Sequence, residues 1–557
     1  MRNGENAMSR RCNESFETPI NNGFRCSFRL VNTATKHILL VVAIKFDSLP
    51  DDTALLRQMV VDLATQLDEH ERRYQRVQNI VEQLLRWRFG RKSEKLDDRQ
   101  MFLFALQWEA EGGTAKQLAA ELGLDENSPL APDEEEAKDA KPARPRGHGR
   151  KPLPRALARE RIEHELGEAE RQCPHCAKTM ERIGEEVSER LEYVPASLKV
   201  IEDARAKYAC SCGGALKTAD KPEQPIEKGL AGASLLAQVA VAKYADHCPL
   251  HRQEVIFRRH GVDLSRKTMG GWMRQTAELL TPLYERLKAR ALDSKVVQTD
   301  DTPVAVLDRS LPQTRQGRIW TYVGEQATVY DYTPTRARAG PEQFLKDYSG
   351  YLQADAYAGY DQLYKEAGRG LVEVACWAHS RRKWYDARSS DLEGATTALG
   401  YIGLLYRIER RARGRTSGER LALRQRLAVP VLEHFKQYLE RVRVRVLPKS
   451  PEAIAVGYAL SNWDALCRYA QDGDLEIDNN AAERSLRGVA VGRRNWTFFG
   501  SDGGGRTAAV LTSFIASCQR LKLDPWAYLC DVLGRIAGHP VNALDELLPA
   551  EWKSANA

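Results

Sequence analysis

Two strand-like runs that each reach an aspartate constrain the fold of this chain more than any other feature. The first is KVVQTDDTPVAVL, whose predicted strand ends at Asp300 with Asp301 next, and the second is GYLQADAYAGYD, which contains Asp355. Between them lie two further strand candidates, RIWTYVG and ATVYDYT, and a helix candidate, GPEQFLKDY. Consecutive strand-like runs followed by a helix and another strand predict a sheet with a mixed α and β architecture.

This order of elements is how a ribonuclease-H-like sheet begins, and in such a sheet Asp300 and Asp355 lie side by side. Further along, DLEIDNNAAERSLRGVAVGRRNW predicts a helix that is capped by Asp478 and carries Glu483 toward the sheet. An oxygen-only set of three carboxylates suits Mg²⁺ or Mn²⁺, and two such ions promote phosphoryl transfer. We therefore predict that Asp300, Asp355 and Glu483 are catalytic metal ligands. The alternative for each is a helix cap or a surface charge.

Basic residues cluster around these carboxylates and are predicted to contact DNA phosphates. They are Arg381, Arg382, Arg487, Arg493, Arg494 and Arg506. His379 lies in the same stretch as the first two, CWAHSRRKW. We expect it either to steady a phosphate or a carboxylate, or to be a structural histidine.

The length of 557 residues exceeds what one hydrophobic core supports and predicts several domains. Lys and Arg total 83 against 76 Asp and Glu, so any nucleic-acid contact must come from local clusters and not from the net charge of +7. The 11 cysteines are mostly scattered, which is typical of a reducing cytosol. No apolar run reaches the ~18 residues that span a bilayer, so we predict a cytoplasmic protein without a membrane partner.

Two close cysteine pairs predict a structural zinc site. CPHC supplies Cys173 and Cys176, and CSC supplies Cys210 and Cys212. Four thiolates from two short turns satisfy tetrahedral zinc, and a zinc ion stabilises a small module that has little core. The alternative is buried free cysteines.

A helix–turn–helix outline follows the cysteines. A helical segment at 235–244 precedes PLHRQEVIFRRHGVDLSRKTMGGWMRQ, in which a Gly-Val-Asp turn separates two helices and Ser265 caps the second. Arg266 and Lys267 lie at the start of that helix, where readers of the DNA major groove make base contacts. The alternative is a plain helical hairpin.

The N-terminal region predicts self-association. From Leu56 to Leu84 apolar residues follow a heptad spacing with charged residues between them. We favour a coiled coil over a helix packed on its own domain. Residues 1–50 show no helical or strand periodicity, and we interpret them as an extension that is disordered or follows from a wrongly chosen start codon.

A charged, Pro-rich segment at 126–160 predicts a linker. Its basic half, KPARPRGHGRKPLP, resembles an AT-hook for the minor groove, but we favour a solvated linker. Near the other end, GSDGGGRT differs from a P-loop in having Arg506 where the lysine belongs. Arginine does not replace that lysine, and too little chain follows for a nucleotide-binding domain. We expect its glycines to form a tight turn and Arg506 to contact DNA.

Taken together, VVQTDDTPV, YLQADAYAGYD, CWAHSRRKW and IDNNAAERSLRGVAVGRRNWTFFGSDGGGRTAAVL resemble the IS66 family of insertion-sequence transposases. LLRWRFGRKSEKL, the two cysteine pairs and LDPWAYLCDVLGRI extend the resemblance over about residues 50–553. It implies a DDE transposase in which Asp300, Asp355 and Glu483 match the catalytic triad. This family usually has Glu after the first Asp, where this chain has Asp301, so the resemblance leaves open which of the two aspartates is the ligand. It also implies a homo-oligomer on DNA and help from small accessory proteins of the same element.

The predicted fold class is multidomain α+β, with a coiled-coil helix, a zinc-binding module, a helical DNA-binding segment and a ribonuclease-H-like core split by a helical insertion. The predicted boundaries are 1–50 for the extension, 51–125 for the coiled coil, 126–160 for the linker, 161–225 for the zinc module, 230–292 for the helix-turn-helix region, 293–390 and 471–535 for the core, 391–470 for the insertion and 536–557 for the C-terminal segment. The predicted function is metal-dependent 3′-end cleavage and strand transfer. The alternatives are an inactive zinc-containing DNA-binding regulator and a structure-specific nuclease.

Overall fold

The computed structural model divides the chain into two compact units, residues 1–93 with 389–391, and the remainder. The structure describes residues 16–20, 24–32, 38–43, 52–67, 160–162, 178, 196–209, 216–220, 222–227, 229–366 and 368–555. Each unit is described by itself.

The first unit contains a three-stranded antiparallel sheet that the sequence analysis did not predict. Its strands are β1 (Phe16–Ile20), β2 (Phe24–Asn32) and β3 (Ile38–Ala43), in the order β1-β2-β3. The expectation that residues 1–50 lack regular structure is therefore wrong for these segments. The physical reason is visible in FRCSFRLV, where apolar and polar residues alternate with the period of two that favours a strand. The same unit has a helix at residues 53–67.

A six-stranded mixed sheet forms the centre of the second unit. Its strands are β6 (Val296–Val306), β7 (Arg315–Val323), β8 (Thr328–Thr333), β9 (Gly350–Ala354), β10 (Leu371–Ala375) and β11 (Phe498–Phe499). The order is β10-β9-β6-β7-β8. The neighbours β6, β7 and β8 are antiparallel, whereas β9 runs parallel to both β6 and β10.

Strand β6 continues well past Asp300, so the prediction that the strand ends there is wrong. Apolar residues Val304 and Val306 are buried and extend the strand to its end. Along one edge of β6, pairing with β9 stops at Gln298 and pairing with β11 starts at Ala305. Asp300 therefore lies in an interval of that edge that neither strand covers.

Helices surround this sheet. The helices that come first in the sequence are α4 (Ala233–Tyr244), α5 (Leu250–Arg259), α6 (Arg266–Leu292), α7 (Ala339–Phe344), α8 (Asp361–Lys365) and α9 (Trp377–Ala387). The helices that follow in the sequence are α10 (Leu392–Ala412), α11 (Ser417–Arg443), α12 (Pro451–Ser461), α13 (Trp463–Cys467), α14 (Asn480–Trp496), α15 (Asp502–Arg520), α16 (Pro525–Arg535) and α17 (Pro549–Ala555).

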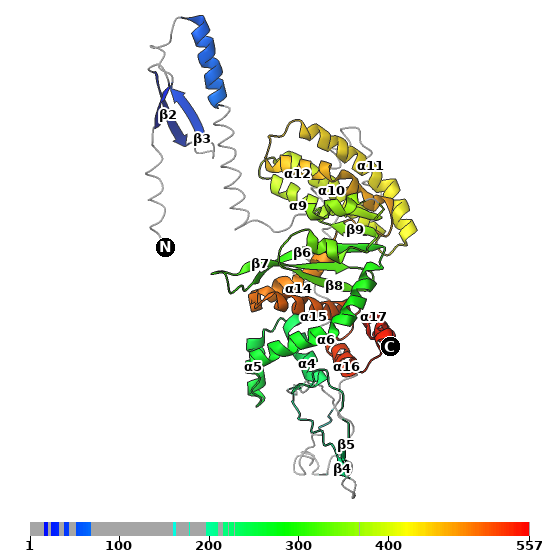
Figure 1. Cartoon of the computed structure of the whole chain (residues 1–557). Coiled ribbons are helices and arrows are strands. Elements are labelled where there is room, and N and C mark those ends of the chain that lie inside the picture. Colours follow the sequence, from blue (N-terminus) through cyan, green and yellow to red (C-terminus); the bar gives the residue numbers. More distant parts are fainter. Residues whose placement is uncertain are drawn as a thin grey trace. The chain divides into compact units, whose positions relative to one another are not determined.

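The helices pack around three hydrophobic cores of the described residues. Helix α14 packs on β6 and β7 and α15 packs on β8, as Figure 1 shows. Helices α9 to α13 form a second core that meets the sheet at β10 through Val374 and Ala375. The sheet thus carries α14 on a face, while the helices inserted between β10 and α14 pack against its β10 edge.

Residues 233–292 fold as three helices in which the predicted cap is present. Ser265 Oγ accepts a hydrogen bond from the backbone N–H of Thr268, which fixes the start of α6. Arg266 and Lys267 are exposed at that start. Helix α6 is much longer than a recognition helix requires, because its buried positions from Met269 to Ala291 continue along the sheet.

Two local predictions near the end of the sheet need correction. The residue that precedes α14 is Asn479 and not Asp478, although Asp478 Oδ1 still accepts from the backbone N–H of Asn480 at 3.2 Å. The glycines of GSDGGGRT form the first turn of α15 and not a tight turn. Gly505 is required there because an added Cβ would lie 2.5 Å from the ring of Tyr332.

Several predictions fall outside the described residues. These are the four cysteines of the zinc site, most of the coiled coil and the AT-hook-like stretch. The antiparallel pair β4 (Lys207–Ala209) and β5 (Leu216–Thr218) brackets the CSC pair in sequence. Among the described helices, none is both long enough and apolar enough to cross a membrane.

Candidate active site

Asp300 and Asp355 come together through the register of two parallel strands. The pairing of β6 with β9 ends at Gln298 and Gln353. Asp300 lies two residues further along β6, and Asp355 directly follows the last residue of β9. Side chains two residues apart in a strand share a face, so the carboxyl group of Asp300 projects on the face of Gln298. The charge of Asp355 is close enough to raise the pKa of Asp300. The pairing of these strands thus brings the two aspartates near each other, and their role as neighbouring metal ligands stays a prediction.

Asp301 projects on the opposite face and is held by two arginines. Its carboxylate accepts from Arg318 Nη1 at 2.8 Å, and from Arg336 Nε and Nη2 at 3.0 and 2.8 Å. Only 3% of its side chain is exposed. Because both of its oxygens are engaged by guanidinium groups, Asp301 is a structural anion here, and Asp300 is the better candidate ligand.

Arg336 links this anion to the candidate site. Its Nη2 also lies 3.7 Å from Asp355 Oδ2, and its guanidinium stacks on the ring of Tyr357 with 4.2 Å to the ring centroid. The sequence analysis missed Arg336, which belongs to the segment between β8 and α7. Its position depends on contacts between segments that are distant in sequence.

Glu483 is positioned by a network that anchors the start of α14 to β6. Gln298 donates through Nε2 to the backbone oxygen of Asp478 at 3.3 Å and accepts through Oε1 from the backbone N–H of Ala481 at 3.1 Å. Asn479, which is fully buried, donates to the backbone oxygen of Thr299 at 3.0 Å. The residues of α14 and its start that make these bonds all precede Glu483, and the bonds hold the first turn of α14 on β6.

The electrostatics of Asp300 reflect the proximity of three carboxyl groups. Burial, together with the negative charges of Asp355 and Glu483, raises the pKa of Asp300 to about 7, while the Asp301 N–H that donates to Oδ1 opposes the shift. A cation placed among these groups would offset both the burial and the repulsion. The three carboxyl groups supply the charge and the oxygen donors that a divalent cation requires. Among the described residues, the metal-type donor atoms that lie within 4.8 Å of one another belong to a different group, which shares Glu483.

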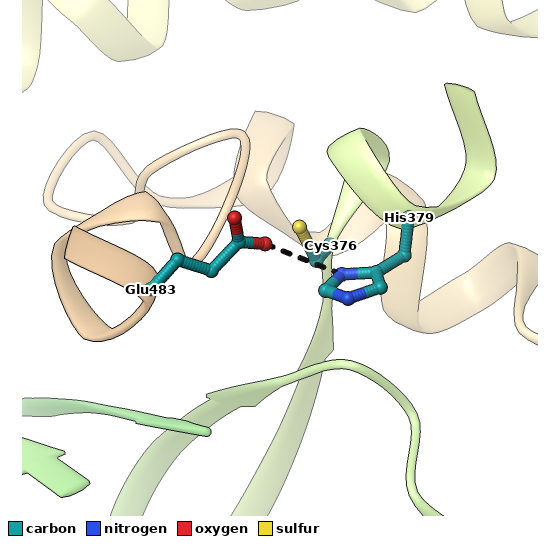
Figure 2. A group of neighbouring side chains, drawn as sticks. All are labelled: Cys376, His379 and Glu483. Carbon is teal, nitrogen blue, oxygen red and sulfur yellow. Dashed lines mark ion pairs between the residues drawn. The ribbon is translucent and has the colours of Figure 1, made fainter. Parts of the chain in front are cut away.

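His379 lies against Glu483 from the opposite side of the site. Its Nδ1 is 3.7 Å from Glu483 Oε1, and Cys376 completes a group whose candidate ligand atoms lie within 4.8 Å of one another, as Figure 2 shows. Cys376 precedes α9 directly and is fully buried, which raises the pKa of its thiol to about 12. The expectation that His379 steadies a carboxylate stays a prediction, whereas the role of Cys376 was missed.

The basic residues that were predicted to contact DNA occupy different environments. Arg487 and Arg494 are exposed and follow Glu483 at spacings of four and eleven, which places them on the same helical face. Arg493 instead ties α14 to β6 by donating to Thr302 Oγ1 at 2.9 Å and to the backbone oxygen of Pro303 at 2.8 Å. Arg382 on α9 and Arg506 on α15 are exposed, and Arg381 stacks on the ring of Tyr406.

Family models match nearly all of the chain after its first 75 residues. The model for "Transposase IS66 family" matches residues 228–507, and the "IS66 C-terminal element" matches 513–550. The "zinc-finger binding domain of transposase IS66" matches 170–213, which includes all four cysteines of the predicted site and supports a structural zinc. The model "Transposase C of IS166 homeodomain" matches 76–162. These matches support DNA as the partner of the chain.

Relatives from Sinorhizobium fredii extend over much of the chain. "Uncharacterized protein y4hP" is 35% identical over 73% of this chain and 78% of its own length. "Uncharacterized protein y4qI" is 32% identical over 91% of this chain and 98% of its own length. Together with the family models, these similarities identify a nucleic-acid-processing enzyme of the transposase type: the chain belongs to the IS66 family of transposases.

Proposed function

We propose that this chain cleaves the 3′ ends of an insertion sequence and joins them to target DNA, with Asp300, Asp355 and Glu483 as its catalytic metal ligands. The observation that carries the proposal is the convergence of these three carboxyl groups, in which Asp355 and Glu483 raise the pKa of the buried Asp300. Such a cluster is unfavourable by itself, and a cation compensates it. Family membership supplies the class of reaction.

The topology supports a ribonuclease-H-like core. Three antiparallel strands, β6 to β8, are followed by a helix and by the parallel strands β9 and β10 on the other side of β6. Helices α10 to α13 then intervene before α14 supplies Glu483. In this proposal the core is split by that helical insertion, with boundaries near those predicted from the sequence.

The donor set fits Mg²⁺ or Mn²⁺ because it offers carboxylate oxygens only. Such ions lower the pKa of the attacking water or 3′-hydroxyl and offset charge on the leaving oxygen. Residues of the protein determine which aspartate of β6 faces the site. Arg318 and Arg336 hold Asp301 on the opposite face, which leaves Asp300 as the ionisable group of β6 that faces α14.

DNA phosphates are proposed to follow the face of α14 that carries Glu483. Arg487 and Arg494 extend along this face from the carboxylate cluster, and Arg382 is exposed on α9, the helix that carries His379. The helix start with Arg266 and Lys267 is proposed to read the terminal repeats, with the zinc module as a second DNA contact. We also propose that the N-terminal heptads pair protomers and that small accessory proteins of the same element assist the chain.

The decisive test incubates the protein with Mg²⁺ and labelled DNA of the terminal inverted repeats, and follows 3′ nicking and joining. We expect Asp355→Asn to abolish cleavage while DNA binding persists. Exposed Asp347→Asn provides a matched carboxylate control with full activity. Unchanged cleavage by Asp355→Asn would refute the active site, and nicking without joining would identify a nuclease.

A further inference from the structure

Three donor atoms of different chemistry meet beside the carboxylate cluster. Cys376 Sγ, a ring nitrogen of His379 and a carboxylate oxygen of Glu483 all lie within 4.8 Å of one another. Figure 2 shows the imidazole and the carboxylate approaching each other, with the sulfur beside them. The three residues come from the start of α9 and the first turn of α14, so the fold and not a local motif brings Glu483 to the other two.

One nitrogen of the imidazole lacks a hydrogen bond within the part of the chain that the structure describes. Nδ1 of His379 is buried and has no hydrogen-bond partner among the described residues. Its separation of 3.7 Å from Glu483 Oε1 is too long for a hydrogen bond. Buried nitrogen atoms are rarely left without a partner in native proteins. This atom therefore points to a ligand that lies between it and the carboxylate.

The separation fits two ligands of one metal ion. Ligands at about 2.0–2.3 Å from a tetrahedral zinc ion lie about 3.3–3.7 Å apart. The nitrogen and the oxygen are already at this separation, and the sulfur lies within 4.8 Å of both residues' ligand atoms. The backbone N–H groups of His379 and Asn479 donate to the sulfur and oppose the burial that raises the pKa of the thiol to about 12, so a metal ion that binds here displaces the thiol proton.

We propose that Cys376, His379 and Glu483 form a second metal site, selective for Zn²⁺ and similar borderline-soft cations, that shares Glu483 with the Mg²⁺ site. One thiolate, one imidazole and one carboxylate form a zinc-type donor set that Mg²⁺ does not favour. Zinc bound here engages Glu483 and withdraws it from the cluster with Asp300. Zn²⁺ is therefore an inhibitor that competes with Mg²⁺, a consequence that rests on the proposed function.

The site itself is tested by metal titration of the full-length protein purified with its tightly bound structural zinc. We expect the wild type to bind one further equivalent of Zn²⁺. Cys376→Ser and His379→Gln should each weaken this binding by more than about tenfold, because even second-shell changes at metal sites cost about 10–100-fold. Cys467→Ser, a matched cysteine outside the cluster, should bind like the wild type.

Co²⁺ offers a spectroscopic readout of the same site. Co²⁺ added to the zinc-loaded wild type should give a thiolate charge-transfer band that is absent in Cys376→Ser and present in Cys467→Ser. Two variants guard against misfolding, because the His379 side chain is 25% exposed and tolerates substitution better than the buried Cys376. Equal affinity in all variants together with an unchanged Co²⁺ spectrum would overturn the proposal.

Inhibition of DNA cleavage by Zn²⁺ tests whether the two metal sites share Glu483, separately from the proposed function. Zn²⁺ should inhibit Mg²⁺-dependent end cleavage by the wild type, and excess Mg²⁺ should relieve the inhibition. The Zn²⁺ concentration for half inhibition should rise more than about tenfold in His379→Gln, in step with its affinity. An unchanged value would overturn the sharing of Glu483. A protein that cleaves no DNA in Mg²⁺ would refute the proposed function, while the titration would still decide the metal site.

Discussion

Asp300 and Asp301 are adjacent in β6, yet their side chains lie on opposite faces of the sheet and in opposite electrostatic environments. Asp300 pairs across β6 and β7 with Thr321, whose hydroxyl contacts Ser485 of α14 at 2.9 Å. Asp301 instead meets Arg318 and Arg336. One aspartate therefore faces the other carboxyl groups, whereas its neighbour faces cations.

Asparagine substitution of these two residues should separate catalysis from stability. We expect Asp300→Asn to abolish end cleavage without lowering the free energy of unfolding, because it removes a buried and repelled carboxylate. Asp301→Asn should lower that free energy by about 1–3 kcal/mol, because it leaves two arginines without their anion. End cleavage and urea unfolding measure the two effects. Equal loss of stability in both variants would contradict the assignment.

The stability cost of Asp300 should depend on pH. Its folded pKa of about 7 lies above the ordinary 3.8, so the folded state holds this proton more tightly than the unfolded chain does. Asp300 therefore destabilises the fold progressively as the pH rises from about 4 to 7, and the full cost persists above pH 7. In Mg²⁺-free buffer, Asp300→Asn should be more stable than the wild type by roughly 2–4 kcal/mol at pH 8 and equal to it at pH 4.

Urea unfolding across that pH range measures the difference, and Mg²⁺ supplies the control. The ion should stabilise the wild type at pH 8 and have no comparable effect on Asp300→Asn. Cleavage by the wild type should fall as the pH drops below about 7, because the protonated carboxyl is a poor ligand. A stability difference that does not change with pH would show that Asp300 ionises normally.

Gln298 should control the position of Glu483 without touching DNA. Its side chain bonds Gln353 at 3.1 Å and both sides of the turn that leads into α14. We expect Gln298→Leu to lower the cleavage rate by about 10–100-fold while DNA affinity stays within about twofold, because a misplaced catalytic group costs rate and not binding. Single-turnover cleavage measures the rate, and filter binding measures the DNA affinity. Exposed Gln362→Leu is the matched control, and an equal loss in both variants would remove the positioning role.

The sequence was sufficient for some parts of this site and insufficient for others. Asp300, Asp355 and Glu483 could be predicted because strand-like and helical periodicities place them on elements whose order is recognisable. The sequence favoured Asp300 and left a doubt about Asp301, because the distinction depends on which sheet face α14 covers. The pairing of His379 with Glu483 also joins segments separated by the whole helical insertion.

Some predictions of single strands and turns were wrong because of features in the nearby sequence. The prediction that the first strand ends at Asp300 gave too much weight to a polar pair, whereas burial of Val304 and Val306 extends β6. Three N-terminal strands were missed although FRCSFRLV alternates with a strand period. Gly503 to Gly505 were expected in a turn because glycine is rare within helices, but close packing on Tyr332 requires Gly505 in the first turn of α15.

The zinc module should hold one tightly bound metal ion per chain. The family match over residues 170–213 covers both cysteine pairs. We expect metal analysis of protein dialysed against Mg²⁺ buffer to find about one zinc per chain, lost when Cys173→Ser and Cys210→Ser are combined. Cys530→Ser is the matched control and should retain the zinc. A wild type without zinc after gentle purification would refute the site.

The helix at residues 53–67 should mediate self-association of the full-length chain. Val60 and Leu67, both on the predicted heptad seam, are 65% and 57% exposed in the single chain. Covering such side chains in a partner contributes roughly 1.5–3 kcal/mol each, so Val60→Glu should weaken association by at least about tenfold. Gln66→Glu introduces the same charge in the same helix, off the seam, and should associate like the wild type. Sedimentation equilibrium measures both, and equal behaviour of the two variants would show that the heptads do not pair protomers.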